Sequence, residues 1–71
     1  MSWRQLQAIR NKQATAETMC QAARNAARAL PPGTRAYQQA IVCRETAGAE
    51  ASRLAIIANR LETRLRNNMP T

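Results

Sequence analysis

The sequence lacks the residue types that most enzymes use for chemistry. Its 71 residues include no histidine and no aspartate, so its four acidic residues are all glutamates. Metal centres and acid–base pairs are built mainly from histidine, carboxylates and cysteine, and two cysteines alone do not make a zinc site. The two glycines are too few for a glycine-rich phosphate loop, and no nucleophile motif occurs. We therefore expect a protein that is not an enzyme and that holds no metal or cofactor.

Large apolar side chains are also scarce. There is no phenylalanine, one tryptophan and one tyrosine, and alanine supplies 15 of the 32 apolar residues. Alanine buries little area, and a chain of this length buries only about 60% of the surface that it exposes when unfolded. We expect one domain over residues 1–71 with marginal stability alone. A partner, or a second copy forming a four-helix dimer, would supply the missing burial.

No long hydrophobic run is present. The longest uncharged apolar stretch covers residues 54–58, which is too short to span a membrane. Residues 2–12 are polar and do not resemble the apolar part of a signal peptide. Cys20 and Cys43 do not form a disulfide framework of the secreted type. These absences predict a cytoplasmic protein.

Two long stretches rich in helix-forming residues are separated once, by Leu-Pro-Pro-Gly-Thr at residues 30–34. The prolines must end the first helix, and Gly33 permits a sharp reversal. Thr34 can then cap the second helix. The sequence therefore predicts an all-α fold, an antiparallel two-helix hairpin with a first helix at about residues 2–30, a turn at 31–34 and a second helix at about 35–67.

Each predicted helix carries one seam with alternating spacings of three and four residues, as in a coiled coil. The first seam is Leu6, Ile9, Gln13, Ala16, Cys20, Ala23, Ala27 and Leu30, and the second is Tyr37, Ala40, Arg44, Ala47, Ala51, Leu54, Ala58, Leu61 and Leu65. Gly48 beside the second seam indicates either a close approach of the helices or a tolerated glycine. Cys20 and Cys43 fall at nearly the same level of the hairpin, so we expect them to lie close together and to be reduced. A disulfide would form only if their Cβ atoms faced each other.

The second helix has more apolar residues than one seam needs. Val42, Ala49 and Ile56 recur every seven residues on the side opposite the seam, and Ile57 flanks it. A repeated apolar stripe on an outer face indicates contact with another protein. We therefore predict that Tyr37, Val42, Ala49, Ile56 and Ile57 contribute to partner binding.

The net charge of +7 offers an alternative. Arg53, Arg60 and Arg64 follow one face of the second helix and could track the phosphates of a nucleic acid. Trp3 and Tyr37 lie near opposite ends of the hairpin, so they are not interleaved with these arginines as stacking aromatics would be. A membrane-surface helix needs bulky apolar residues opposite its basic face, which the alanine-rich seam does not offer. Binding to protein is the first hypothesis, and a basic nucleic-acid-binding regulator is the second.

Three segments of the second helix resemble a known family. Arg-Ala-Tyr-Gln-Gln at residues 35–39, Arg44-Glu45, and Ala-Ser-Arg-Leu-Ala-Ile-Ile at 51–57 are similar to the second helix of the YscE-type needle co-chaperones. These are small cytoplasmic helical hairpins of bacterial type III secretion systems. The resemblance covers residues 34–65 and implies a role beside a larger helical-repeat chaperone that keeps the needle subunit soluble. It implies packing or partner contact at Tyr37, Leu54, Ile56 and Ile57. The alanine-rich first helix differs from the leucine-rich one of the family.

Overall fold

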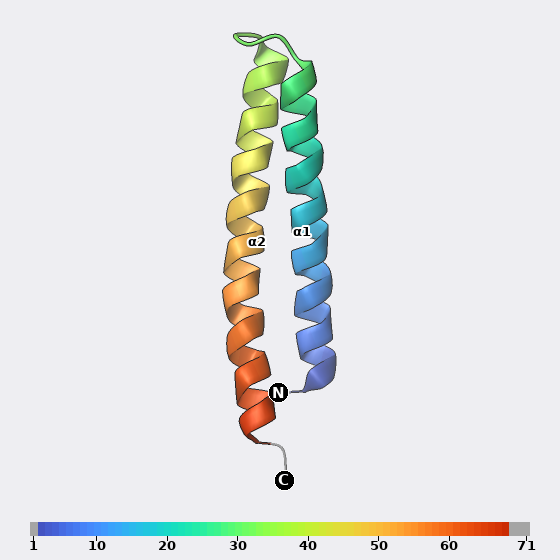
Figure 1. Cartoon of the computed structure of the whole chain (residues 1–71), viewed down its shortest axis with the longest axis vertical. Helices are drawn as coiled ribbons and strands as arrows, with labels where there is room; N and C mark the ends of the chain where they lie inside the picture. The colour runs from blue at the N-terminus through green and yellow to red at the C-terminus, as the bar shows by residue number, and fades with distance from the viewer. Residues whose placement is uncertain (1, 69–71) are drawn as a thin grey trace.

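The computed structural model describes residues 2–68 as two α-helices, α1 (Trp3–Ala29) and α2 (Arg35–Asn67). The helices run antiparallel, side by side, and are joined by a tight turn at one end (Figure 1). The Cα trace is 57 Å long and only 14 by 13 Å across. The predicted all-α hairpin is confirmed. Its second helix has the predicted bounds, and its first is one residue shorter at each end.

Side-chain caps define where both helices begin. Ser2 forms a capping box with Gln5: its Oγ accepts from the Gln5 N–H at 3.2 Å, and the Gln5 side-chain oxygen accepts from the Ser2 N–H at 2.8 Å. The sequence analysis did not identify this cap, although Ser-x-x-Gln is a known signal for one. Thr34 caps α2 as predicted, because its Oγ1 accepts from the Tyr37 N–H at 3.2 Å.

The turn follows from the chemistry of the prolines and Gly33. Leu30, which precedes a proline, is extended at φ −100° and ψ 144°, so α1 ends at Ala29. Gly33 has φ +87°, a conformation that side chains with a Cβ rarely adopt. The Thr34 hydroxyl then donates to the Pro31 carbonyl at 2.8 Å and closes the turn. This short connection sets the register of the two helices.

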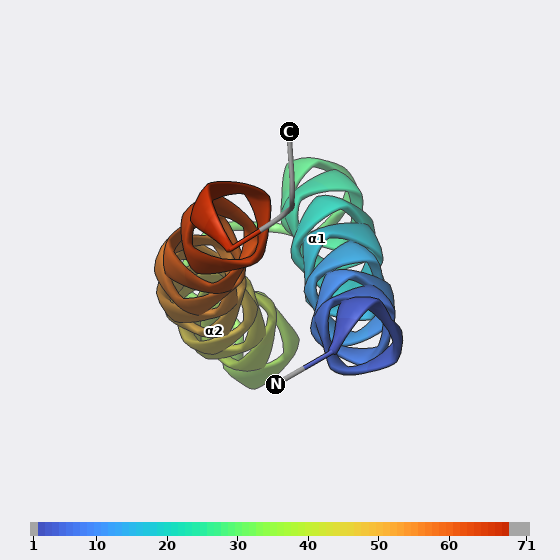
Figure 2. The ribbon, with the colours of Figure 1, turned by 90° about the horizontal axis from the view of Figure 1, so that it is seen from below.

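The core lies between the two predicted seams. Every position of both seams is buried or half-buried, which confirms them. The buried apolar residues are two leucines and six alanines: Leu6, Ala16, Ala27, Ala40, Ala47, Ala51, Ala58 and Leu61. The two leucines pack with Ala58 into one cluster at the open end of the hairpin, opposite the turn. Seen end-on, the helices are inclined to one another, as expected for two helices that pack along heptad seams (Figure 2).

Cys20 marks the middle of the interface. Its thiol donates to the Arg44 carbonyl oxygen at 3.4 Å, so it lies at the level of Cys43 as predicted. Both thiols are free, and Cys20 is half-buried while Cys43 is exposed. A Cβ at Gly48 would lie 3.5 Å from the Cys20 sulfur, which is ordinary van der Waals contact. The interface therefore has room for alanine at position 48, and close approach does not require the glycine.

Replacement of Gly48 by alanine should stabilise the hairpin. Alanine removes the entropic cost of a glycine in a helix, about 0.5–1 kcal/mol, without a steric penalty at this site. Urea denaturation followed by circular dichroism would measure the gain. Gly33→Ala is the opposite control, because φ +87° is unfavourable for alanine and the variant should lose about 1 kcal/mol or more. A less stable Gly48→Ala variant would show that contact with Cys20 outweighs the helix propensity.

Candidate protein-binding surface

More large apolar side chains are exposed than buried on the described part of the hairpin. Only two of the buried core residues, Leu6 and Leu61, are larger than alanine. Five large apolar side chains are exposed: Trp3 (45%), Met19 (61%), Val42 (59%), Ile56 (52%) and Ile57 (44%). A monomeric protein usually buries such residues in preference to alanine. Such a distribution is typical of proteins whose exposed apolar side chains bind another molecule.

The structure divides the five residues predicted to bind a partner. Val42, Ala49 and Ile56 are exposed, and their seven-residue spacing places them on one outer face of α2. Ile57 follows Ile56 directly, so it projects about 100° away from that face. Tyr37 is half-buried in the seam and belongs to neither surface. Partner binding by these residues stays a prediction, and it now concerns two surfaces of α2.

Three apolar grooves run between the helices. The open-end groove has a volume of about 540 Å³, and its lining residues are Gln5, Ala8, Ile9, Ile57, Arg60, Leu61 and Arg64. A turn-end groove of about 370 Å³ is lined by Ala16, Met19, Val42, Cys43, Thr46, Ala47 and Glu50. A middle groove of about 350 Å³ is lined by Asn11, Lys12, Thr15, Ala16, Met19, Glu50 and Leu54.

Helical spacing places the three grooves on one side of the hairpin. On α1 they share a row with steps of three and four residues: Gln5, Ala8, Lys12, Thr15 and Met19. On α2 they share a row with steps of seven: Cys43, Glu50, Ile57 and Arg64. We call this side the groove face. It joins Met19 of α1 with Ile57 of α2 along one trough, and Val42 of the outer stripe borders its turn end.

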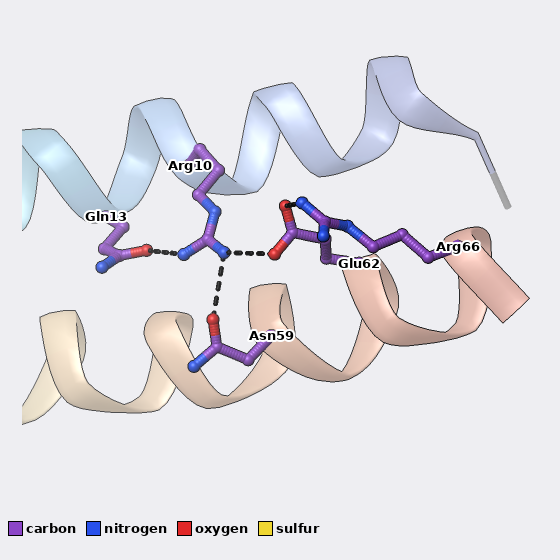
Figure 3. Close-up of polar contacts among 5 residues, drawn as sticks. All are labelled: Arg10, Gln13, Asn59, Glu62 and Arg66. Carbon is purple, nitrogen blue, oxygen red and sulfur yellow. Dashed lines mark hydrogen bonds and ion pairs between the residues drawn. The ribbon is translucent and has the colours of Figure 1, made fainter.

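A polar network bridges the helices around Arg10 (Figure 3). The Arg10 guanidinium donates to the side-chain oxygens of Gln13 and Asn59, each at 3.0 Å, and to Glu62 at 3.4 Å. Arg66 donates to the other Glu62 oxygen at 3.3 Å. Arg10 and Glu62 each expose only 33% of their side chains, so water screens this pair less than an ordinary surface pair. None of these five residues lines the three grooves, because the network lies on the other flank of the seams.

The predicted basic row does not form one uniform surface. Arg53 makes an ion pair with Glu50, which offsets its charge. Arg60 and Arg64 both line the open-end groove. The same two arginines also line a shallow polar depression beside Asn67. Among the described residues, Arg60 has no hydrogen-bond or ion-pair partner. Positive charge is therefore concentrated at the open end of the groove face.

Comparison with protein-family models, with curated proteins and with solved structures gives no match. The similarity to needle co-chaperones therefore rests on the sequence pattern alone. Neither described helix is long and apolar enough to cross a membrane. Within residues 2–68, no three histidine, cysteine or acidic side chains are grouped so that they could hold a metal ion.

Proposed function

We propose that this chain is a non-enzymatic helical hairpin that binds another protein. The observation that carries the proposal is that large apolar side chains lie on the surface while the buried core consists mainly of alanine. The exposed side chains are those of Met19, Val42, Ile56 and Ile57. Covering these side chains contributes about 25 cal/mol for each Å² removed from water. A partner that binds only the folded hairpin also stabilises it by mass action.

The co-chaperone role is the most specific form of this proposal. The pattern at residues 34–65 supports pairing with a larger helical-repeat chaperone in the bacterial cytoplasm, where the two would hold a needle subunit soluble. A folded two-helix rod with spare apolar surface suits such a role, because it can add its helices to those of the larger chaperone. Without the partner, two hairpins would cover the same surfaces by forming a four-helix dimer.

Nucleic-acid binding is the second candidate, and the pairing of Arg60 and Arg64 at the open end is the observation that favours it. The ion pair between Arg53 and Glu50 weakens the candidate, because it shortens the basic row to two residues. No aromatic side chain lines the grooves around these arginines, so bases would have nothing to stack on. Protein binding therefore accounts for more of the surface.

A tagged pull-down from the native host tests the proposal. We would use about 0.3 M salt, which weakens phosphate contacts far more than apolar ones, and compare nuclease-treated and untreated halves. The co-chaperone proposal expects a helical-repeat protein and a small needle-like subunit in both halves. Recovery of nucleic acid, or of proteins that disappear after nuclease treatment, would instead make the arginines the functional surface.

Ile56→Asp should reduce recovery of the partner at least about tenfold, equivalent to about 1.4 kcal/mol, because it places a charge in the apolar contact. Helicity should be retained, since Ile56 is 52% exposed and lies outside the core. Ser52→Asp is the matched control, because it adds the same charge at an exposed position one turn away without removing an apolar side chain. An unfolded Ile56→Asp variant would show that Ile56 belongs to the core.

A further inference from the structure

We propose that a second copy of this chain packs antiparallel on the outer stripe of α2, which is Val42, Ala49 and Ile56, with a two-fold axis at Ala49. The inference rests on the proposed function, because it specifies the dimer that the hairpin forms without its partner. The stripe lies on the side of α2 opposite the seam, so two α2 helices can meet there without displacing α1. Apolar spacing and charge each support a second copy as the occupant.

The spacing of the outer stripe is symmetric about Ala49. Val42 and Ile56 each lie seven residues from it, or about 10 Å along the helix at 1.5 Å per residue. In an antiparallel pair with its axis at Ala49, Val42 of each copy lies level with Ile56 of the other. The small Ala49 side chains at the axis allow the two helices to approach closely. One contact thus covers Val42 and Ile56 of both copies, which are 59% and 52% exposed in the single hairpin.

Other registers lose these apolar pairs. If one copy slides by seven residues in one direction, Val42 meets Ala49 and Ile56 meets Arg35. If it slides by seven residues in the other direction, Ile56 meets Ala49 and Val42 meets Thr63. Of the three registers, only the one centred on Ala49 pairs the large apolar side chains with each other.

The charges beside the stripe are also complementary about Ala49. Glu45 precedes Ala49 by four residues and Arg53 follows it by four, so each Glu45 lies level with Arg53 of the other copy. Glu45 is exposed and makes no hydrogen bond or ion pair with the described residues. Arg53 already pairs with Glu50 through Nη2, but a guanidinium has five N–H donors and can bind two carboxylates at once. The dimer therefore gains two ion pairs without requiring Arg53 to leave Glu50.

The remaining exposed residues of this face bring no like charges to the same level. They pair as Arg35 with Thr63, Gln38 with Arg60 and Thr46 with Ser52. The net charge of +7 on each copy opposes association, but about 0.15 M salt screens exposed charges more than about 8 Å apart. A nucleic acid fits this face less well, because Glu45 would repel phosphates and the apolar stripe would stay uncovered. With two large apolar side chains from each copy the interface is small, so we expect a weak dimer.

The test is sedimentation equilibrium of the full chain at about 0.15 M salt and up to about 1 mM protein, which populates even a weak dimer. Glu45→Arg and Arg53→Glu should each weaken the wild-type dimer at least about tenfold, because the symmetry places two like-charge pairs in the interface. An equimolar mixture of the two variants should associate about as well as the wild type. In the mixed dimer, position 45 of each copy again faces an opposite charge at position 53 of the other.

Glu17→Arg and Arg24→Glu are the matched controls, because they make the same charge changes at exposed positions of α1. Neither should alter self-association, alone or mixed. Ile56→Asp should abolish the dimer and retain helicity, whereas Ile57→Asp on the groove face should keep the dimer.

A wild-type chain that stays monomeric, or a mixture that associates no better than its two components, would overturn the inference. An equal loss with Ile57→Asp and Ile56→Asp would also overturn it, because the contact would then not be specific to the outer stripe. The pull-down separates this failure from that of the proposed function. A monomeric chain that recovers a protein partner would uphold protein binding and refute the second copy, while a chain that dimerises but recovers no partner would do the reverse.

Discussion

An Ala58→Glu variant should lose the cooperative fold of the hairpin. Ala58 has no exposed surface and packs with Leu6 and Leu61 in the apolar cluster. A carboxylate there would be buried without a hydrogen-bond partner, at a cost of several kcal/mol. A single small core supplies only about 3–5 kcal/mol of stability, so the variant should be largely unfolded. Thermal melting followed by circular dichroism should show no cooperative transition.

The control for this variant is the same substitution at Ala49, which is exposed on the same helix. Alanine and glutamate are both good helix formers, so the two variants differ mainly in which face receives the charge. Ala49→Glu should melt close to the wild-type temperature. If Ala58→Glu melted there too, α1 and α2 would not meet at this position, and the seams would be wrong.

A Leu61→Ala variant should lose about 2–4 kcal/mol of unfolding free energy, because it removes one of the two large buried side chains. The measurement is the midpoint and slope of urea denaturation. Ile56→Ala removes a side chain of similar size from a position that is 52% exposed, and it should cost less than about 1 kcal/mol. Equal losses at the two positions would contradict the burial difference between them.

The turn and the two seams could be predicted because they depend on local chemistry and periodicity. The paired prolines end α1 whatever the rest of the chain does. Thr34 caps α2 because its Oγ1 accepts from the N–H of Tyr37, only three residues further along the chain. The heptad spacing then identifies the buried stripe of each helix, including its polar members Gln13 and Arg44. Both signals are readable without knowing how the helices meet.

The two sides of the hairpin could not be predicted in the same way. Periodicity identifies the seam of each helix. It does not show on which side of the seams polar side chains will connect the two helices and on which side open grooves will remain. That depends on the register, which brings Arg10 within 3.0 Å of Asn59 although 49 residues separate them. The outer stripe was visible as a repeat of seven, whereas the groove face combines Met19 of α1 with Ile57 of α2. Only the paired helices bring these residues together.

The position of the leucine cluster has a consequence for how the chain folds and tolerates trimming. Leu6 and Leu61 are 55 residues apart, so their contact closes nearly the longest loop that this chain allows. The entropic cost of closing a loop rises by about 0.6 kcal/mol with each doubling of its length. Between the turn and the leucine cluster, the buried residues are all alanines, so the largest buried contact forms at the far end of the loop. The ends of most domains can be shortened at little cost. Here the first turns of α1 and the last turns of α2 hold the two large buried side chains, so proteolysis at either end should destabilise the whole hairpin.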